Sequence, residues 1–243
     1  MGATAILCIE TSSKVRSQIA LGQRVSKTAN ITWSLQHLGP KASQGEQLCT
    51  AIKTLLEKNG TEIQDLETIF VSAGPGSYTG IRIGMATALG LALVHNISVV
   101  PVGTLLCLGI GASGAMKGRN DTLFLPLVKA QKGQVSGSLY QIHDHQPRAL
   151  LADSTLNPQE WVKALSAFPQ RSVVIFGDGF LAYKMDFLRD LKAANTSYKT
   201  FPDSWKYHHP QAQCLAAFGQ DGFGKSSHQL FYPRPNHQEF KAS

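Results

Sequence analysis

The sequence predicts a mixed α/β fold in two lobes, and three observations lead to this prediction. The chain has 243 residues, enough for two domains, and its 43% hydrophobic and 16% charged content is that of a globular protein. The first hundred residues read as three strands followed by alternating helices and strands. The second half holds a similar, less regular series. We therefore expect a first lobe at residues 1–103 and a reduced second lobe at 104–243, whose last helix can pack back on the first lobe.

Three strands open the first lobe. TAILCIE (residues 4–10), SQIAL (17–21) and TANITWS (28–34) are short apolar segments joined by polar turns, so we expect an antiparallel meander. A helix follows over residues 43–60, because its apolar residues recur at helical intervals and Asn59-Gly60 is a good C-terminal stop.

The rest of the first lobe alternates. A strand at 67–72 leads through a glycine-rich turn into an apolar helix that runs to about His95, and a strand at 97–102 follows. Three antiparallel strands followed by helix, strand, helix and strand are typical of a ribonuclease-H-like lobe, in which helices cover a mixed sheet.

The second half is predicted to begin with a glycine-rich helix at 104–116 and a hairpin of strands at 121–130 and 133–143. Asn157-Pro158-Gln159-Glu160 has the residues of a helix N-terminus: a cap, a proline at the first position and a capping-box acid. The remaining predicted elements are a buried strand in residues 171–179, a helix at 180–194 and a last helix at 209–220.

The turn AGPGSYTGIRIG (residues 73–84) has the glycines of a phosphate-binding loop but not their spacing. Gly80 is followed by Ile81 and Arg82, so neither the lysine nor the hydroxyl of a P-loop is present, and the spacing is one residue too long for a dinucleotide fingerprint. We interpret it as a structural turn that permits positive φ angles and a close helix approach, with Ser77 or Thr79 capping the helix. The residues assigned to this turn are Gly74, Pro75, Gly76 and Ser77.

The helix after the turn is apolar almost all round, since only Arg82 and Thr87 are polar between residues 81 and 94. Small residues recur every fourth position along one ridge, and larger ones form the next. Two explanations stand: the helix is central to the core of its own lobe, or it forms a helix-pair interface together with the first helix. The candidate interface residues are Leu48, Ala51, Ile52, Leu55, Gly80, Ile81, Arg82, Gly84, Met85, Ala88, Leu89 and Ala92.

Composition narrows the class of protein. No apolar run reaches the roughly 18 residues of a membrane span, and no basic region precedes the short apolar segment at the N-terminus, so we expect neither a membrane protein nor a signal peptide. The four scattered cysteines, Cys8, Cys49, Cys107 and Cys214, favour reduced thiols in the cytoplasm. The net charge of +7 is compatible with an RNA-containing partner and equally with simple solubility.

An ATP-dependent phosphotransferase is one alternative. Glu10, Thr11 and Ser12 would then hold magnesium and phosphate near the turn at residues 177–179. The turn after the first strand lacks a glycine that would admit phosphate to the backbone, and Lys129 stands where a second carboxylate would be needed.

A metallopeptidase is another alternative. Its ligands would come from His143, Asp144, His145, the pair His208-His209 and His228, but the sequence has no H-E-x-x-H motif. We therefore expect these histidines to be solvated or hydrogen-bonded, and we expect no metal.

Taken together, the predicted lobe and the glycine turn resemble the TsaB family, also called YeaZ. GPGSYTGIRIG (residues 74–84) with the following ATALGLAL resembles the signature of that family, and ILCIETS (6–12) and FYPRP (231–235) support the match. The resemblance implies an actin-like fold of two ribonuclease-H-like lobes. It also implies a subunit without catalytic residues or cofactor of its own, required for N6-threonylcarbamoyladenosine (t6A) at adenosine 37 of tRNA.

The same resemblance implies partners. The helix pair would bind the enzyme TsaD as a heterodimer or a second copy of the chain, TsaE would join the larger complex, tRNA would be contacted indirectly, and ATP and threonylcarbamoyl-AMP would be used by the partner complex. Departures from the family pattern are Glu10 for an aspartate, Gln44 for a histidine, and Lys129-Ala130-Gln131 for Asp-Ala-Arg. The role of Lys129 stays open, with contact to an acidic group of a partner or to RNA as the hypothesis.

Overall fold

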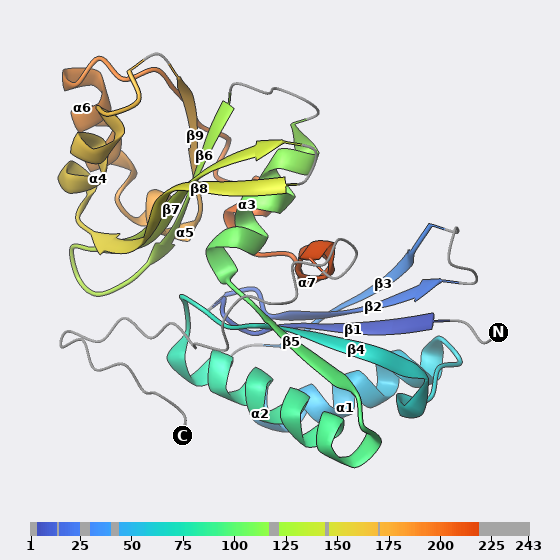
Figure 1. The fold of residues 1–243 in the computed structure, drawn as a ribbon. Helices are drawn as coiled ribbons and strands as arrows, with labels where there is room; N and C mark the ends of the chain where they lie inside the picture. The colour runs from blue at the N-terminus through green and yellow to red at the C-terminus, as the bar shows by residue number, and fades with distance from the viewer. Residues whose placement is uncertain are drawn as a thin grey trace, which may run out of the picture. The chain divides into compact units, whose positions relative to one another are not determined.

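A computed structural model describes residues 4–13, 15–24, 30–39, 44–116, 122–143, 146–169 and 171–218. The chain divides into two compact units, one formed by residues up to 104 together with those from 211 onward, the other by residues 105–210 (Figure 1). FYPRP (residues 231–235), Asp144, His145 and His228 lie outside the described residues.

The first unit is built on a mixed sheet of five strands in the order β3-β2-β1-β4-β5. β1 pairs antiparallel with β2, and β2 with β3, which confirms the predicted meander; β1–β4 and β4–β5 are parallel. The strands are β1 (Thr4–Glu10), β2 (Gln18–Arg24), β3 (Thr32–His37), β4 (Leu66–Ser72) and β5 (Ser98–Val102).

Two helices, α1 (Gln44–Lys58) and α2 (Tyr78–His95), cover one face of this sheet, as Figure 1 shows. Alternate residues of β1, such as Leu7 and Ile9, point toward these helices and form the core with them. The short helix α7 (Ala212–Leu215) packs against β1, β2 and β4, so the last described segment completes the first unit. The predicted last helix is thus much shorter than expected and continues only as the 3-10 turn η4 (Ala216–Phe218).

The second unit repeats this design. Its sheet has the order β10-β9-β6-β7-β8, in which the first strand of the unit is again central, flanked by an antiparallel hairpin and by parallel strands. The strands are β6 (Thr122–Lys129), β7 (Val135–His143), β8 (Gln146–Leu156), β9 (Ser172–Phe176) and β10 (Tyr198–Lys199). The two sheets therefore share the ribonuclease-H-like strand order, which confirms the predicted actin-like α/β class.

The helices of the second unit lie on both faces of its sheet. α4 (Pro158–Leu165), α5 (Asp178–Ala182) and α6 (Lys184–Ala193) enclose one apolar core with Trp161, Phe180 and Phe187. α3 (Thr104–Ala115) covers the other face, where Gly109 packs against Tyr140. The helix predicted at 180–194 is in fact two helices.

The expected reduction of the second lobe needs correction. Sequence analysis overlooked β8 and β10, and the sheet has as many strands as the first one. Only β10 is much reduced, to two residues. Within the described part of the chain, none of the helices is both long and apolar enough to cross a membrane.

Candidate partner interface and the closed loop after the first strand

The loop after β1 is held by the side chain of its own acid. Glu10 is fully buried, and its Oε1 accepts hydrogen bonds from the backbone N–H of Ser12 at 2.7 Å, from the Ser12 hydroxyl at 2.5 Å and from the N–H of Ser13 at 3.3 Å. The N–H of Thr11 donates to Ser72 Oγ at 3.1 Å. The backbone donors at the tip of this strand are therefore bonded within the protein, where a phosphate-binding loop would present them to a ligand.

The glycine turn closes this loop from outside. A Cβ on Gly76 would lie 2.5 Å from the carbonyl oxygen of Ser12, and a Cβ on Gly80 would overlap the carbonyl oxygen of Thr11. The N–H of Ser77 donates to the same Ser12 oxygen at 2.7 Å, and Ser77 Oγ caps α2 by accepting from the N–H of Gly80. The glycines thus serve a direct packing of the turn onto the loop after β1, with no space for a phosphate between them.

Burial sets the ionisation of Glu10. Removal from water raises its pKa from 4.5 to about 7, although the hydrogen bonds from Ser12, Ser13 and Ser72 favour the charged form. The carboxyl group is directed into its own loop and is 0% exposed, so it does not face a bound metal or nucleotide at the surface.

The rest of the glycine turn is bonded to the start of α3. Gly74 has a φ of +101°, and its carbonyl oxygen accepts from the N–H of Thr104 at 2.6 Å. Pro75 follows and is buried. The whole turn is therefore a fixed connection between β4, α2 and the start of α3.

The second unit closes its equivalent turn in the same way. A Cβ on Gly177 would overlap the carbonyl oxygen of Leu127, and Gly179 packs on the backbone of Leu127 and Val128 at the end of β6. Asp178 Oδ1 accepts from the backbone N–H of Lys129 at 2.9 Å. The Lys129 side chain is exposed, and its proposed contact with a partner or RNA stays a prediction.

The described histidines among the proposed metal ligands do not gather. His143 is exposed at the end of β7, whereas both ring nitrogens of the buried His208 are hydrogen-bonded within the protein. Among the described residues, no group of three histidine, cysteine or acidic side chains is placed to hold a metal ion.

The predicted interface residues on α1 are core residues. Leu48, Ala51, Ile52 and Leu55 are all at most 6% exposed and pack with β1 inside the first unit. They are therefore part of the core of their own unit, and the partner interface stays a prediction.

The small-residue ridge of α2 is also buried. Gly80, Ile81, Gly84 and Ala88 face their own sheet and loop, and a Cβ on Gly84 would overlap the Thr11 hydroxyl. The ridge lets α2 approach the end of β1. For these residues, the first of the two explanations therefore holds: the helix belongs to the core of its own lobe. A corollary is that Gly84→Leu or Ala88→Glu would unfold the unit.

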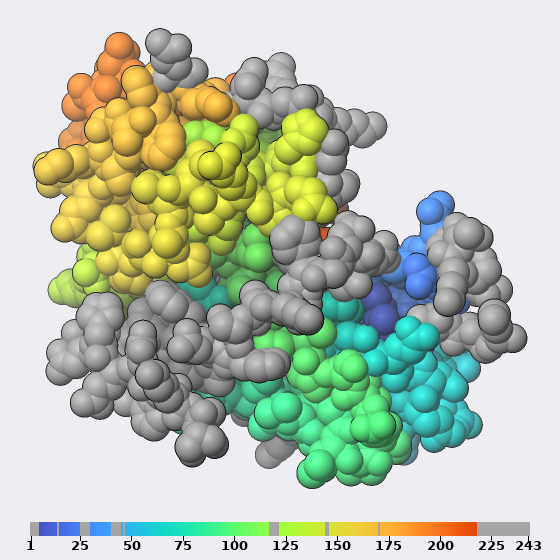
Figure 2. All heavy atoms as spheres, viewed as in Figure 1, coloured from blue at the N-terminus to red at the C-terminus, as the bar shows by residue number. Residues whose placement is uncertain are grey.

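The opposite face of α2 is exposed and apolar. Met85 and Ala92 lie at the edge of the core, while Arg82 and Leu89 point outward. The large, well-exposed apolar side chains of this helix are Tyr78 (41%), Leu89 (53%), Leu93 (87%) and Val94 (76%). Tyr78, Arg82, Leu89 and Leu93 recur at helical spacing and form one stripe, the α2 stripe. Figure 2 shows residues of α2 at the surface of the first unit.

Arg82 is the charge on this stripe. Its guanidinium carbon lies 3.9 Å from the centre of the Tyr78 ring, a cation–π contact at the start of the helix.

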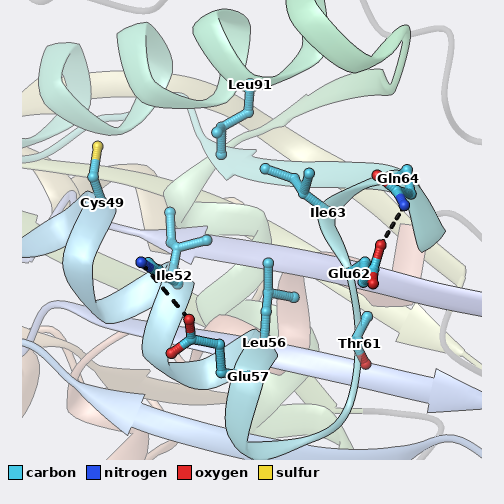
Figure 3. Close-up of a pocket in the computed structure, with 10 residues that line it drawn as sticks. Cys49, Ile52, Leu56, Glu57, Thr61, Glu62, Ile63, Gln64 and Leu91 are labelled. Carbon is cyan, nitrogen blue, oxygen red and sulfur yellow. Dashed lines mark hydrogen bonds and ion pairs between the residues drawn. The ribbon is translucent and has the colours of Figure 1, made fainter.

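An apolar groove of about 410 Å³ borders α2 on its α1 side. Ile52 and Leu56 of α1, Ile63 of the connecting 3-10 turn η2 (Ile63–Asp65) and Leu91 of α2 point toward one another across it, as Figure 3 shows. Cys49, Lys53, Glu57, Thr61, Glu62 and Gln64 complete the lining. The exposed Val94 is one helical turn from Leu91 and so lies beside the groove, whereas the α2 stripe lies on another side of the helix.

A comparison with protein families decides what kind of chain this is. The family model for TsaD, tRNA N6-adenosine threonylcarbamoyltransferase, matches residues 41–198, well over half of the chain. The chain belongs to this family. The matched segment begins just before α1 and includes α2, the glycine turn and most of the second unit.

Known proteins agree with the TsaB resemblance seen in the motifs. The tRNA threonylcarbamoyladenosine biosynthesis protein TsaB of Bacillus subtilis is 28% identical over 226 residues, 93% of this chain and 91% of the relative. TsaB of Escherichia coli is 32% identical over 96 residues, 40% of each chain. The structure of YeaZ from Pseudomonas aeruginosa superposes with a TM-score of 0.69 at 18% identity, covering 89% of this chain and 90% of that one, and so shows the same fold. The predicted TsaB family is confirmed.

Sequence reasoning missed Leu93, Val94 and Tyr78 as surface residues of this TsaD-family chain. The signal was present: a ridge that includes two glycines beside a polar loop belongs against backbone, which leaves the side of the helix away from the glycines for the outside. Ser72 and Ile63 were missed for a different reason, since their roles depend on long-range contacts that no local pattern contains.

Proposed function

We propose that this chain is a non-catalytic subunit required for t6A modification of adenosine 37 in tRNA, and that it binds a TsaD-type enzyme through the α2 stripe. The full-length relative is named as a t6A biosynthesis protein, and the matching family model is that of the transferase itself. The observation that carries the proposal is the exposed apolar stripe on a helix whose other face is fully used by its own core.

The closed strand ends support the non-catalytic part. In the first unit Glu10 binds its own loop, and in the second Asp178 binds the backbone of Lys129. The backbone donors of an actin-like nucleotide site are used internally in both units. We propose that the chain holds no cofactor and that ATP and threonylcarbamoyl-AMP are bound by the partner complex.

The free energies of burial and of association support an interface larger than the α2 stripe. Full burial of Leu89, Leu93 and Val94 contributes roughly 5 to 9 kcal/mol, which is comparable to the roughly 4 to 15 kcal/mol that association costs. The neighbouring groove, lined by Leu56, Ile63 and Leu91, supplies further apolar surface. A partner surface that wraps around α2 would cover both the α2 stripe and the groove.

The same surface serves a second copy of this chain when TsaD is absent, so a homodimer and the heterodimer exclude each other. In the larger complex TsaE joins the heterodimer, and tRNA is contacted through the partner. We place the protein in the cytoplasm, where tRNA is modified.

The test is co-purification of this chain with the TsaD protein of the same organism, followed by size-exclusion chromatography with light scattering. The wild-type chain forms a heterodimer, and Leu93→Glu abolishes it because a charge is buried in the α2 stripe. Met185→Glu, which changes an equally exposed apolar residue on α6 (78% exposed), leaves the heterodimer intact.

Two results would contradict the proposal in different ways. If the wild-type chain and TsaD do not associate, the assigned function is wrong. If they associate and Leu93→Glu binds as well as wild type, the function stands and the α2 stripe is not the interface.

A further inference from the structure

The segment that leaves the second unit is fastened by one histidine. Residues 200–210, here called the strap, run from β10 to α7 and contain the 3-10 turn η3 (Lys206–His208). The strap is the last segment of the second unit, and the chain enters the first unit directly after it, at Gln211. His208, in this strap, is only 1% exposed.

One ring nitrogen of His208 faces a hydrogen-bond donor, and the other faces an acceptor. The backbone N–H of Gly177 donates to Nδ1 at 3.0 Å, and Nε2 lies 3.1 Å from the carbonyl oxygen of Pro202. An amide N–H only donates and a carbonyl oxygen only accepts, so Nδ1 must be the acceptor and Nε2 must carry the proton. The geometry therefore requires the neutral imidazole.

The histidine joins the strap to a turn that is itself tightly packed. Gly177 ends β9, and its φ of +109° and its contact with Leu127 fix the direction of its N–H. Beside it, the Trp205 ring packs edge-on against the Phe176 ring and stacks on the Phe201 ring, with distances between ring centres of 5.5 Å and 3.8 Å. Gly177 N–H has a buried acceptor only while His208 is in place.

The charges around His208 are few and nearly balanced. Asp203 of the strap favours the protonated ring and Lys184 of α6 opposes it, and these two form an ion pair of 2.6 Å with each other. Asp178 of the turn accepts from the backbone of Lys129. Burial is the largest influence and lowers the pKa of His208 below its ordinary value of 6.5.

We propose that His208 is a pH-sensitive pin that holds the strap on the turn between β9 and α5, and that its protonation releases the strap. A proton on Nδ1 would face the Gly177 N–H, so two donors would meet in a buried site and the hydrogen bond would be lost. The rest of the second unit keeps its own core and stays folded.

The experiment is hydrogen exchange of the full chain, followed by mass spectrometry of peptides that cover residues 172–182 and 200–210. After correction for intrinsic rates, protection in these peptides falls about tenfold from pH 7.5 to pH 5.5, since each pH unit below the pKa of an exposed histidine, about 6.5, changes the equilibrium about tenfold. Protection at β4, in the first unit, does not fall.

Two variants separate this pin from a general acid effect. In His208→Asn the amide oxygen can accept from Gly177 without titrating, so the pH-dependent loss disappears while protection at pH 7.5 stays. His37→Asn, which changes an exposed histidine on β3, keeps the loss. The proposal is overturned if His208→Asn shows the same pH dependence as wild type, or if wild type shows none.

A second measurement needs no variant. The ring ¹⁵N and ¹³C shifts of His208 in the wild-type chain should report the Nε2–H tautomer at pH 7.5 and a midpoint below pH 6.5 that coincides with the loss of protection. A charged ring or an Nδ1–H tautomer at pH 7.5 contradicts the proposal.

Discussion

Gly80 of α2 lies directly on the backbone of Thr11, so closely that a Cβ would overlap the carbonyl oxygen of the threonine. This contact joins the first turn of α2 to the end of the central strand. It explains why the glycine turn closes the loop after β1 and why the small-residue ridge of α2 is turned inward.

Gly80→Ala should destabilise the first unit by about 3 kcal/mol, because the new methyl group meets backbone atoms that cannot move aside. Gly90→Ala is the matched control on the same helix: nothing lies within 4 Å of its Cβ position, so the better helix propensity of alanine should stabilise by about 0.5 to 1 kcal/mol. Urea unfolding of both variants measures the difference. Equal effects would show that the contact with Thr11 is not tight.

Glu10→Gln should change how stability depends on pH. The folded state raises the pKa of Glu10 from 4.5 to about 7, so between these values the folded chain binds more protons than the unfolded chain. This group therefore lowers stability as pH rises from about 4.5 to about 7, by about 3 kcal/mol in all. The stability of Glu10→Gln relative to wild type should increase by that amount between pH 4.5 and pH 8.

The control for this pH series is Glu57→Gln, which changes an exposed acid paired with Lys53 on α1. Its stability relative to wild type should stay constant over the same range. Chemical denaturation at several pH values gives both curves, and parallel curves for Glu10→Gln and wild type would disprove the role of burial.

Cys49 should be the thiol of the native chain that reacts first with a maleimide, because it is exposed at the rim of the groove while Cys8 and Cys107 are buried. Burial also raises the pKa of Cys8, which keeps it as an unreactive thiol. Bound TsaD should slow the labelling of Cys49 at least tenfold if the groove belongs to the interface. Unchanged labelling in a purified heterodimer would limit the interface to the α2 stripe.

Asn157→Ala should destabilise the second unit by about 1 kcal/mol. Its side chain accepts from the N–H of Glu160, and the Glu160 carboxylate accepts from the N–H of Asn157, so the substitution removes one half of a capping box. Gln159→Ala on the exposed side of the same turn is the control. Thermal unfolding should separate the two variants by several degrees.

Most of the fold follows from local patterns, and the exceptions have physical causes. The meander, α1, the glycine turn and the cap at Asn157 carry strong signals of apolar spacing and turn chemistry. β8 carries none, because it contains Pro147 and Asp153 and its exposure does not alternate. The break between α5 and α6 at Tyr183 likewise has no signal in the sequence.

The candidate site was harder to predict than the fold. α2 is apolar on all sides, so periodicity could not tell its inner face from its outer one. The contact between Gly80 and Thr11 determines which face of α2 is turned inward. These residues lie far apart in the sequence, so the contact exists only in the folded chain. The family itself could be recognised because the glycine turn is long, ungapped and specific.

The position of α7 on β1, β2 and β4 also bears on biosynthesis. A ribosome delivers the first sheet early, but the helix that covers its second face emerges only after the entire second unit has been made. The later half can therefore close before the earlier one is finished, and a nascent chain must carry this face of the sheet without α7 until residues 212–215 have been translated.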